Sequence, residues 1–295
     1  MGLLNRVVLG TAGLGGVWGP VHHEESVETI LYGLEQGISH IDTAPAYMDA
    51  EEIVGNALKQ WKGQAPLIST KIGKRRGLAA QTGLIDYETE HLKTSVFKSL
   101  ERMHLKQIDL LFLHEPDLIP KEKLGQILDL LVYFKEEGLV KKLGLGGRPP
   151  EFLHPYIEKG HFDVVMDFNG YNLVERKAEH ADFPYYRKHR LEIYEGSPLM
   201  MGLLGQRLEE FVKNKPVWLS KVHVQKAQEM NLLAIQHKMV LSSLAHRFFL
   251  FNNIIDKVVV GPSGLSQLGS TISDFKNGPL SEHLQGMLSG NIKQL

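Results

Sequence analysis

Residues 39–47 read Ser39-His40-Ile41-Asp42-Thr43-Ala44-Pro45-Ala46-Tyr47, which places a carboxylate, a turn and a phenol close together in the chain. A short run suited to a strand leads to Asp42, and Pro45 prevents that strand from continuing. Acidic residues follow at 49, 51 and 52, as is common in the first turn of a helix. The stretch therefore predicts a strand that ends at Asp42, a loop that carries Tyr47, and a helix after the loop.

The same order of strand, loop and helix recurs along the whole chain. Short apolar runs typical of strands lie at 7–11, 39–42, 67–71, 108–114, 142–146, 164–168, 191–194 and 257–260. Stretches with helical periodicity lie at 24–34, 51–61, 87–104, 121–137, 150–159, 232–249 and 265–275. Residues 173–190 are weakly helical, and we interpret 205–221 as a long connection.

Strict alternation of strands and helices implies parallel strands with right-handed crossovers. Eight such units in a chain of 295 residues have the size of a closed (β/α)8 barrel, the TIM-barrel fold. The alternative is an open doubly wound sheet. In that fold the glycine-rich dinucleotide-binding turn leads directly into a helix, whereas the glycine-rich residues 10–16 are not followed at once by a helical pattern. We predict one barrel domain over 1–295, with active-site loops at 75–86 and 205–221 and a C-terminal tail at 276–295.

The composition is that of an ordinary globular protein, and it excludes several functions. The formal net charge of −1 gives no electrostatic reason to expect nucleic acid or a membrane surface as a partner. No apolar run approaches the roughly 18 residues that a membrane span needs. The absence of cysteine excludes disulfides, thiolate nucleophiles and Cys-based metal sites, and it favours a cytoplasmic setting. We expect a small-molecule substrate and no metal ion; the sequence carries no signal for the oligomeric state.

Three consecutive strands end on residues that can carry chemistry. Asp42 ends the second strand, Lys71 the third and His114 the fourth, and Tyr47 lies in the loop after the second. In a barrel the carboxyl ends of the strands meet at one face, so these side chains can converge. An ammonium group lowers the pKa of a nearby phenol, which is ordinarily ~10. We therefore expect Asp42 to keep Lys71 charged, and Lys71 to lower the pKa of Tyr47.

In this hypothesis Tyr47 exchanges a proton with an oxygen atom whose carbon exchanges hydride with a cofactor, while His114 positions that oxygen. Each residue also has an ordinary structural interpretation, since Asp42 suits a turn and Lys71 suits a solvated rim. A histidine at a strand end is most often a satisfied structural group. An aldolase with Lys71 as a Schiff-base amine is a further alternative, but it gives Asp42 and Tyr47 no role. The joint placement of the four residues is what favours the oxidoreductase.

Several stretches, in the order of the chain, resemble landmarks of the aldo-keto reductases. They are D-T-A-x-x-Y at 42–47, Ser69-Thr70-Lys71, Ser99-Leu100-Glu101-Arg102-Met103, Ile108-Asp109-Leu110 leading to His114, and Ser197-Pro198-Leu199 with Gly202-Leu203-Leu204. The resemblance covers nearly the whole chain and implies a (β/α)8 barrel, in agreement with the strand count. It also implies reversible hydride transfer between a nicotinamide ring and a carbonyl or alcohol carbon. The catalytic tetrad that it implies is Asp42, Tyr47, Lys71 and His114.

Shorter features resemble one branch of that family, the aldose dehydrogenases that act on L-fucose, L-galactose or D-threo-aldoses. These features lie at 10–16, 86–87, 114–117 and 196–204. The resemblance implies a sugar dehydrogenase or an aldehyde or ketone reductase that uses Tyr47 as general acid and base. The alternative is a cofactor-binding regulatory protein with little turnover, and the intact tetrad argues against it.

The resemblance also implies which residues contact the cofactor and the substrate. Cofactor contacts are expected from Thr11, Ala12, Gly146, Asp167, Ser197, Leu199, Gly202, Gly261, Ser263, Gln267 and Thr271. Trp18, in the loop after the first strand, is expected to wall the substrate pocket with Tyr47 and His114; the alternative is that Trp18 caps the barrel.

Some positions depart from the family pattern. Gly146-Gly147 replaces a Ser-Asn pair that holds the nicotinamide amide, Gly196 replaces a tyrosine that stacks on the ring, and Thr271 replaces a common adenine-binding asparagine. The segment 261–267, after the last strand, carries no lysine or arginine for the 2′-phosphate of NADP. We expect NAD or NADP as cofactor, with NAD favoured unless a cation from another loop reaches the site.

Overall fold

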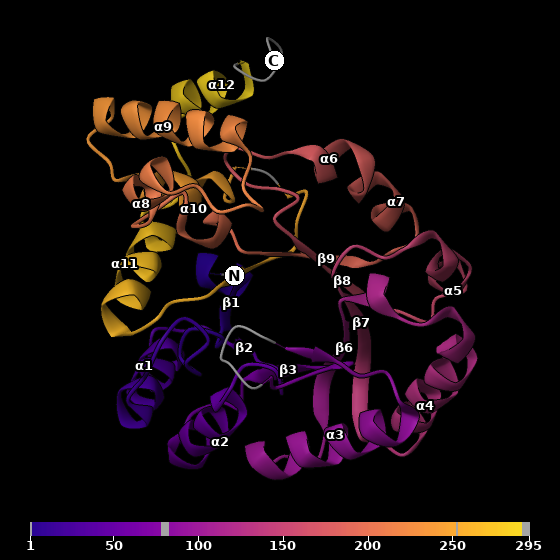
Figure 1. Cartoon of the computed structure of the whole chain (residues 1–295). Coiled ribbons are helices and arrows are strands. Elements are labelled where there is room, and N and C mark those ends of the chain that lie inside the picture. The colour runs from indigo at the N-terminus through magenta and orange to yellow at the C-terminus, as the bar shows by residue number, and fades with distance from the viewer. Residues whose placement is uncertain (1, 78–82, 252, 291–295) are drawn as a thin grey trace.

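The computed structural model describes residues 2–77, 83–251 and 253–290, and its centre is a closed barrel of parallel strands (Figure 1). The strands are β1 (Val7–Gly10), β2 (His40–Asp42), β3 (Leu67–Ile72), β6 (Ile108–His114), β7 (Val140–Gly146), β8 (Val164–Phe168), β9 (Glu192–Gly196) and β10 (Lys257–Val260). Their order around the barrel is β1-β10-β9-β8-β7-β6-β3-β2. All of the predicted strands are present, and the predicted barrel is confirmed.

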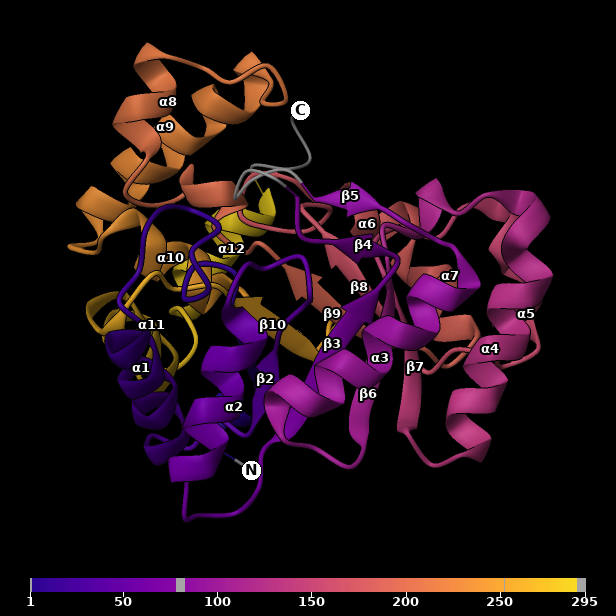
Figure 2. The same cartoon turned by 60° about the horizontal axis from the view of Figure 1, so that its bottom comes forward.

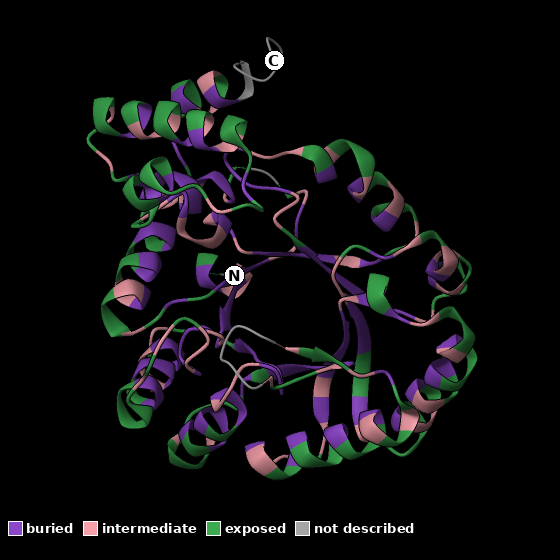
Figure 3. Cartoon of the chain, in the orientation of Figure 1, coloured by how far each residue is buried: buried purple, intermediate pink, exposed green. Residues whose placement is uncertain are grey.

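Helices surround the barrel on the outside (Figure 1). They are α1 (His23–Glu35), α2 (Ala50–Gln60), α3 (Thr89–Met103), α4 (Leu124–Glu136), α5 (His154–Glu158), α6 (Lys177–Ala181), α7 (Phe183–Lys188), α8 (Leu208–Lys213), α9 (Lys221–Gln236), α10 (Leu241–Phe248), α11 (Leu265–Lys276) and α12 (Glu282–Gly290). Figure 3 shows that the buried sides of these helices face the strands. In α2, for example, Ile53, Val54 and Ala57 are buried, because residues three and four apart share one face of a helix. In the described part of the chain, no helix is long and apolar enough to cross a membrane.

Alternation along the strands decides which side chains point into the barrel. The barrel interior is packed by Val8, Leu110, Phe112, Val164, Met166, Tyr194 and Val259. Lys71 pairs in register with Phe112, and Asp42 pairs with Ser69, which is itself opposite Leu110. The side chains of Asp42 and Lys71 therefore lie on the inner face, at the carboxyl ends of their strands.

The predicted helix over 232–249 is wrong, because the structure has two helices there. α9 begins at Lys221, where the Ser220 hydroxyl accepts a hydrogen bond from the backbone N–H of His223 at 3.1 Å, and it ends at Gln236. Lys238 then takes a left-handed conformation with φ of 56°, which stops the helix, and α10 begins at Leu241. The apolar pattern that suggested one helix is divided between two.

The loops and the tail contain more regular structure than expected. The 205–221 connection contains α8, and Figure 2 shows α8 and α9 projecting beyond the barrel at the end where β4 and β5 also lie. β4 (Lys74–Arg75) and β5 (Leu84–Ile85) form a short antiparallel pair within the 75–86 loop, of which 78–82 lie outside the described residues. The tail at 276–295 contains α12, and its last five residues lie outside the described part.

Candidate active site

Asp42 and Lys71 form a buried ion pair at the mouth of the barrel. The Lys71 Nζ atom lies 2.5 Å from Asp42 Oδ2 and also donates to the backbone carbonyl of Thr43 at 2.9 Å. Each of the two charged side chains is about 2% exposed, so the pair is shielded from water. The same ammonium lies 4.8 Å from the centroid of the Tyr47 ring. β2 and β3 thus bring a fixed positive charge to the phenol.

A tight turn after β2 places Tyr47 over this pair. The backbone N–H of Tyr47 donates to Ala44 O at 2.9 Å, and its carbonyl accepts from the N–H of Ala50 at 3.1 Å. Gly15 packs against this turn so closely that a Cβ atom there would lie 2.2 Å from the Tyr47 carbonyl oxygen. His114, from the end of β6, contacts the phenol edge-on, with ring centroids 5.9 Å apart. The predicted convergence of the four side chains is therefore present in the structure.

The pKa of Tyr47 in the structure differs from the sequence-based expectation. Burial raises the pKa of the phenol above its ordinary value, although Lys71 acts to lower it. Burial also opposes the charge of Lys71, but Asp42 and Tyr47 outweigh it, so the pKa of Lys71 is raised and the ammonium stays charged. Burial, together with Lys71 and Lys74, holds the pKa of His114 well below its ordinary value, so the imidazole is neutral. The site therefore combines a protonated phenol, a cation and a neutral histidine.

A cleft of about 2300 Å³ opens above these residues and extends to the start of α11. Its lining includes most of the predicted site residues: Ala12, Trp18, Asp42, Tyr47, Lys71, His114, Gly146, Ser197, Leu199, Gly202, Gly261, Ser263, Gln267 and Thr271. Thr11 lies just beneath, where its hydroxyl donates to the Asp42 carbonyl at 3.0 Å, so it supports the end of β2 and does not face the cleft. Asp167 does not line the cleft either.

Asp167 faces away from the barrel interior, because it alternates with the inward-facing Met166 and lies opposite Glu195 on β9. This placement does not support the expected nicotinamide contact of Asp167. The two buried carboxyl groups hydrogen-bond each other, which requires that one of them carries a proton. Burial, with a contribution from Asp182, raises the pKa of Asp167 to about 6. Burial and Asp167 raise the pKa of Glu195 well above its ordinary value.

The variant Glu195→Gln is expected to reduce the loss of stability that accompanies a rise in pH from 5 to 8. Because the folded-state pKa values are raised, the stability that this pair contributes is complete below the ordinary carboxyl pKa of ~4 and is lost as the pH rises through about 6. A glutamine still donates to Asp167 and cannot ionise. The variant removes the raised pKa of Glu195, so between pH 5 and pH 8 it should lose less unfolding free energy than the wild type, by at least about 1 kcal/mol.

Urea unfolding at these two pH values measures this effect, with the exposed Glu28→Gln as the matched control. Parallel stability losses in the wild type and in Glu195→Gln would contradict a shared proton at this pair.

One aromatic residue of the cleft was not singled out from the sequence. Phe168, at the end of β8, is 57% exposed and lies beside Gly196, where a Cβ atom would be 3.5 Å from its ring. An aromatic face thus stands next to the position where the family pattern expects a stacking tyrosine. Lys74 and Glu115 form an ion pair that also lines the cleft. The sequence could have indicated Phe168, because it lies two positions after Met166 on β8 and its side chain therefore points to the same, inner face.

The far end of the cleft contains a cation from another loop. The Gln267 side chain accepts from the backbone N–H of Ser263 at 2.9 Å and donates to Gln206 Oε1 at 3.2 Å. Arg207, next to Gln206, lines the cleft as well and is paired with Glu210 at 2.7 Å. The positive charge near the 261–267 segment is therefore largely balanced by a carboxylate. Within the described residues, no group of three or more His, Asp or Glu side chains is placed to hold a metal ion.

A closed barrel with this set of aspartate, tyrosine, lysine and histidine at its mouth defines a nicotinamide-dependent oxidoreductase. Residues 6–287 match the aldo/keto reductase family, and the chain belongs to that family, whose members use NAD(P)H. It is 25% identical to L-galactose dehydrogenase of Arabidopsis thaliana, over 92% of this chain and 84% of that protein. It is equally 25% identical to the NADH-specific methylglyoxal reductase of Escherichia coli, over 92% of this chain and 89% of that protein.

Among solved structures, the glycerol dehydrogenase AKR11B4 of Gluconobacter oxydans superposes with a TM-score of 0.79 at 25% identity, covering 98% of this chain and 91% of that one. The predicted family is therefore confirmed, and the chain is an NAD(P)-dependent oxidoreductase. These relatives act on different substrates at equal identity, so the family assignment leaves the substrate to be inferred from the site.

Proposed function

We propose that this enzyme is an aldose dehydrogenase or a reductase of small hydroxylated aldehydes and ketones, with Tyr47 as its general acid and base. The observation that carries the proposal is the fixed distance between the Lys71 ammonium and the Tyr47 ring, 4.8 Å, beside a neutral His114. A protonated phenol next to a permanent cation is equipped to give a proton to an alkoxide-like oxygen and to take it back.

Each residue of the tetrad has a distinct part in this proposal. In the reductive direction Tyr47 donates its proton to the substrate oxygen, and Lys71 stabilises the phenolate that is left. Asp42 holds Lys71 in place and charged through the contact at 2.5 Å. The neutral imidazole of His114 retains one N–H, which can donate to the same oxygen and orient the carbonyl. The bound nicotinamide supplies or accepts the hydride.

The floor of the cleft leaves room for the flat nicotinamide ring of a dinucleotide cofactor. Gly10, Gly196 and Gly146 end β1, β9 and β7, and Gly261 follows β10, so four of the five successive strand ends from β1 to β7 carry no side chain, and the fifth, β8, ends on Phe168. A Cβ atom at Gly196 would lie 3.2 Å from the Asp167 carbonyl oxygen, so this position is crowded and the glycine leaves the space above it open. We propose that Phe168 gives the ring an apolar face and that residues 261–271 hold the adenosine end.

We propose NAD as the preferred cofactor. Residues 261–267 carry no cation, and Arg207 is already paired with Glu210 through two of its three guanidinium nitrogens, Nε and Nη2. A 2′-phosphate would compete with that carboxylate for the guanidinium, whereas the ribose hydroxyl of NAD needs no cation.

The mouth of the cleft suits a hydroxylated substrate. Trp18 is 45% exposed and lines the cleft, as do the ion-paired Lys74 and Glu115. An aromatic face with charged hydrogen-bonding groups beside it fits the apolar and hydroxyl-bearing faces of a sugar. An aldolase is disfavoured, because Lys71 is held as a charged ammonium by Asp42 and is not a free amine.

The proposal is tested by following absorbance at 340 nm with NAD or NADP and a panel of aldoses, and with NADH or NADPH and short aldehydes and ketones. Turnover of aldoses or small hydroxylated carbonyls, with NAD(H) preferred, is the expected result. Turnover restricted to apolar aldehydes would overturn the proposed substrate class. A strong preference for NADP would overturn the proposal that Arg207, paired with Glu210, does not bind a 2′-phosphate. Tight cofactor binding with no turnover would support the regulatory alternative.

A further inference from the structure

A buried polar chain lies inside the barrel directly behind Asp42. The hydroxyl of Ser69 donates to Asp42 Oδ1 at 2.7 Å, and His40 Nε2 lies 3.1 Å from the same Ser69 oxygen. His40 precedes Asp42 by two positions on β2, and Ser69 precedes Lys71 by two on β3, so all four share the inner face. His40 is 2% exposed and Ser69 is fully buried. The proposed tetrad thus has two inner neighbours.

The proton positions along this chain follow from its donors and acceptors. Ser69 has a single hydroxyl hydrogen, and Asp42 receives it, so the Ser69 oxygen must accept from His40 Nε2–H. Burial, reinforced by Lys257, lowers the pKa of His40 to about 3, so the ring is neutral at every working pH. The chain therefore runs in one direction, from His40 through Ser69 to Asp42, with His40 in its Nε2–H form.

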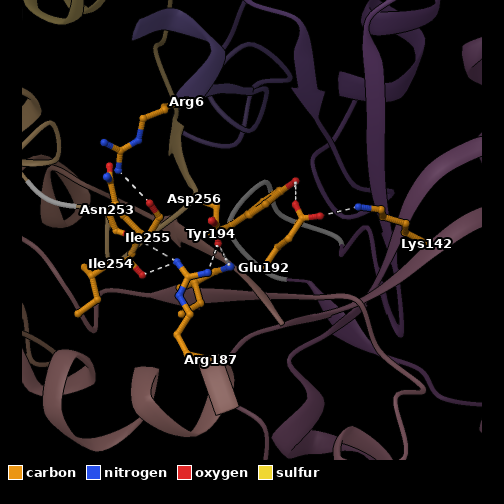
Figure 4. A network of polar contacts seen from close by, with 10 residues as sticks. Arg6, Lys142, Arg187, Glu192, Tyr194, Asn253, Ile254, Ile255 and Asp256 are labelled. Atoms are coloured by element: carbon orange, nitrogen blue, oxygen red, sulfur yellow. Dashed lines mark hydrogen bonds and ion pairs between the residues drawn. The ribbon is translucent and has the colours of Figure 1, made fainter. Parts of the chain in front are cut away.

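The inner end of the chain is closed by aromatic packing. The His40 ring meets Tyr194 edge-on, with centroids 5.7 Å apart. Tyr194 is held in turn by the network at the opposite end of the barrel, where its hydroxyl points to Glu192 and Glu192 pairs with Lys142 (Figure 4). Among the described residues, His40 Nδ1 has no hydrogen-bond partner. The histidine consequently has one role open to it, as a donor toward Ser69.

We propose that His40 and Ser69 are positioning residues that set the strength of the Tyr47 acid through Asp42. Their chain fixes one carboxylate oxygen, so the other is presented to Lys71. The hydrogen bond from Ser69 also stabilises negative charge on Asp42 Oδ1, which leaves less of that charge on Oδ2, the oxygen that faces Lys71. Without it, Asp42 would cancel more of the Lys71 charge. The groups that act on the pKa of Tyr47 are Lys71, Asp42 and Glu115.

The geometry is tested without any substrate by ¹H–¹⁵N NMR of histidine-labelled protein, with the His40 signals assigned by their loss in His40→Gln. The expected result is a neutral Nε2–H ring that does not titrate between pH 5 and pH 9, with a slowly exchanging proton. Ser69→Ala should speed that exchange. An Nδ1–H form, or a ring that titrates near ~6.5, would overturn the proposal. This measurement stands whether or not the proposed reaction is correct.

The effect on catalysis, which rests on the proposed function, is tested with Ser69→Ala against Thr70→Val. Thr70 is the matched control, since its hydroxyl donates to the buried carboxylate of Glu51 at 2.8 Å on the outer face of the same strand. In Ser69→Ala we expect kcat for reduction to fall about tenfold with KM nearly unchanged. The alkaline limb of the pH profile should move up by about one pH unit.

His40→Phe should act in the same direction as Ser69→Ala, and His40→Gln, which keeps an N–H donor, should recover part of the activity. Thr70→Val should leave the pH profile in place even where it lowers stability. A pH profile unchanged in Ser69→Ala, or moved equally by Thr70→Val, would refute the positioning role.

Discussion

Replacing Tyr47 with phenylalanine is expected to lower kcat by about a thousandfold, because it removes the proposed proton donor and nothing else. The ring remains, so its edge-on contact with His114 and its contact with the Lys71 ammonium are kept. Cofactor binding should therefore change by less than about twofold, since the lost hydroxyl interacts with Lys71 and is proposed to meet the reacting oxygen, so its removal weakens the transition state and not the binding of the cofactor. Stopped-flow or steady-state turnover measures the first quantity, and quenching of protein fluorescence by NADH measures the second.

Tyr133→Phe provides the control for this substitution. Tyr133 lies on α4, outside the cleft lining, so removal of its hydroxyl makes the same chemical change far from the proposed chemistry. Turnover in Tyr47→Phe equal to that of Tyr133→Phe would remove Tyr47 from the mechanism. A parallel loss of cofactor binding in Tyr47→Phe would instead indicate that the loop had moved.

The sequence predicted the barrel and the convergence of the tetrad because both depend on strand order. Once Asp42, Lys71 and His114 end successive strands, a closed parallel barrel brings them to one face whatever the loops do. The misplacement of Asp167 came from ignoring side-chain parity. On β8 the inward positions are Met166 and Phe168, so Asp167 points to the helices, and its partner Glu195 had no signal of its own in the sequence.

Other features depend on how deeply a side chain is buried and on the local backbone conformation, and neither can be inferred from the pattern of residues. Lys71 was expected to lower the pKa of Tyr47, but the penalty for burying a phenolate is larger, and only the packed structure reveals it. Likewise, the break between α9 and α10 rests on the positive φ of Lys238, a residue type that does not ordinarily mark a helix end. Arg207 lines the cleft beside residues 261–267 but comes from the loop after β9, so its large separation in sequence gave no indication of this proximity.

Lys71→Met is expected to damage both stability and catalysis, and the two effects have different origins. The substitution leaves Asp42 buried without the ammonium that now lies 2.5 Å away, and an unpaired buried carboxylate costs about 3–5 kcal/mol of folding free energy. It also removes the cation that stabilises the Tyr47 phenolate, so kcat should fall by about 100-fold or more in the fraction that folds. Urea unfolding and turnover of the same preparation separate the two losses.

The double variant Lys71→Met with Asp42→Asn decides between these origins. Asparagine keeps an oxygen that can accept from Ser69, as Asp42 Oδ1 does at 2.7 Å, and it carries no charge to leave unpaired. Most of the lost stability should therefore return, while activity stays low because no cation faces Tyr47. If the double variant is as unstable as Lys71→Met, the cavity rather than the orphaned charge is responsible. If it regains turnover, the positive charge near the phenol is dispensable, and the proposed role of Lys71 fails.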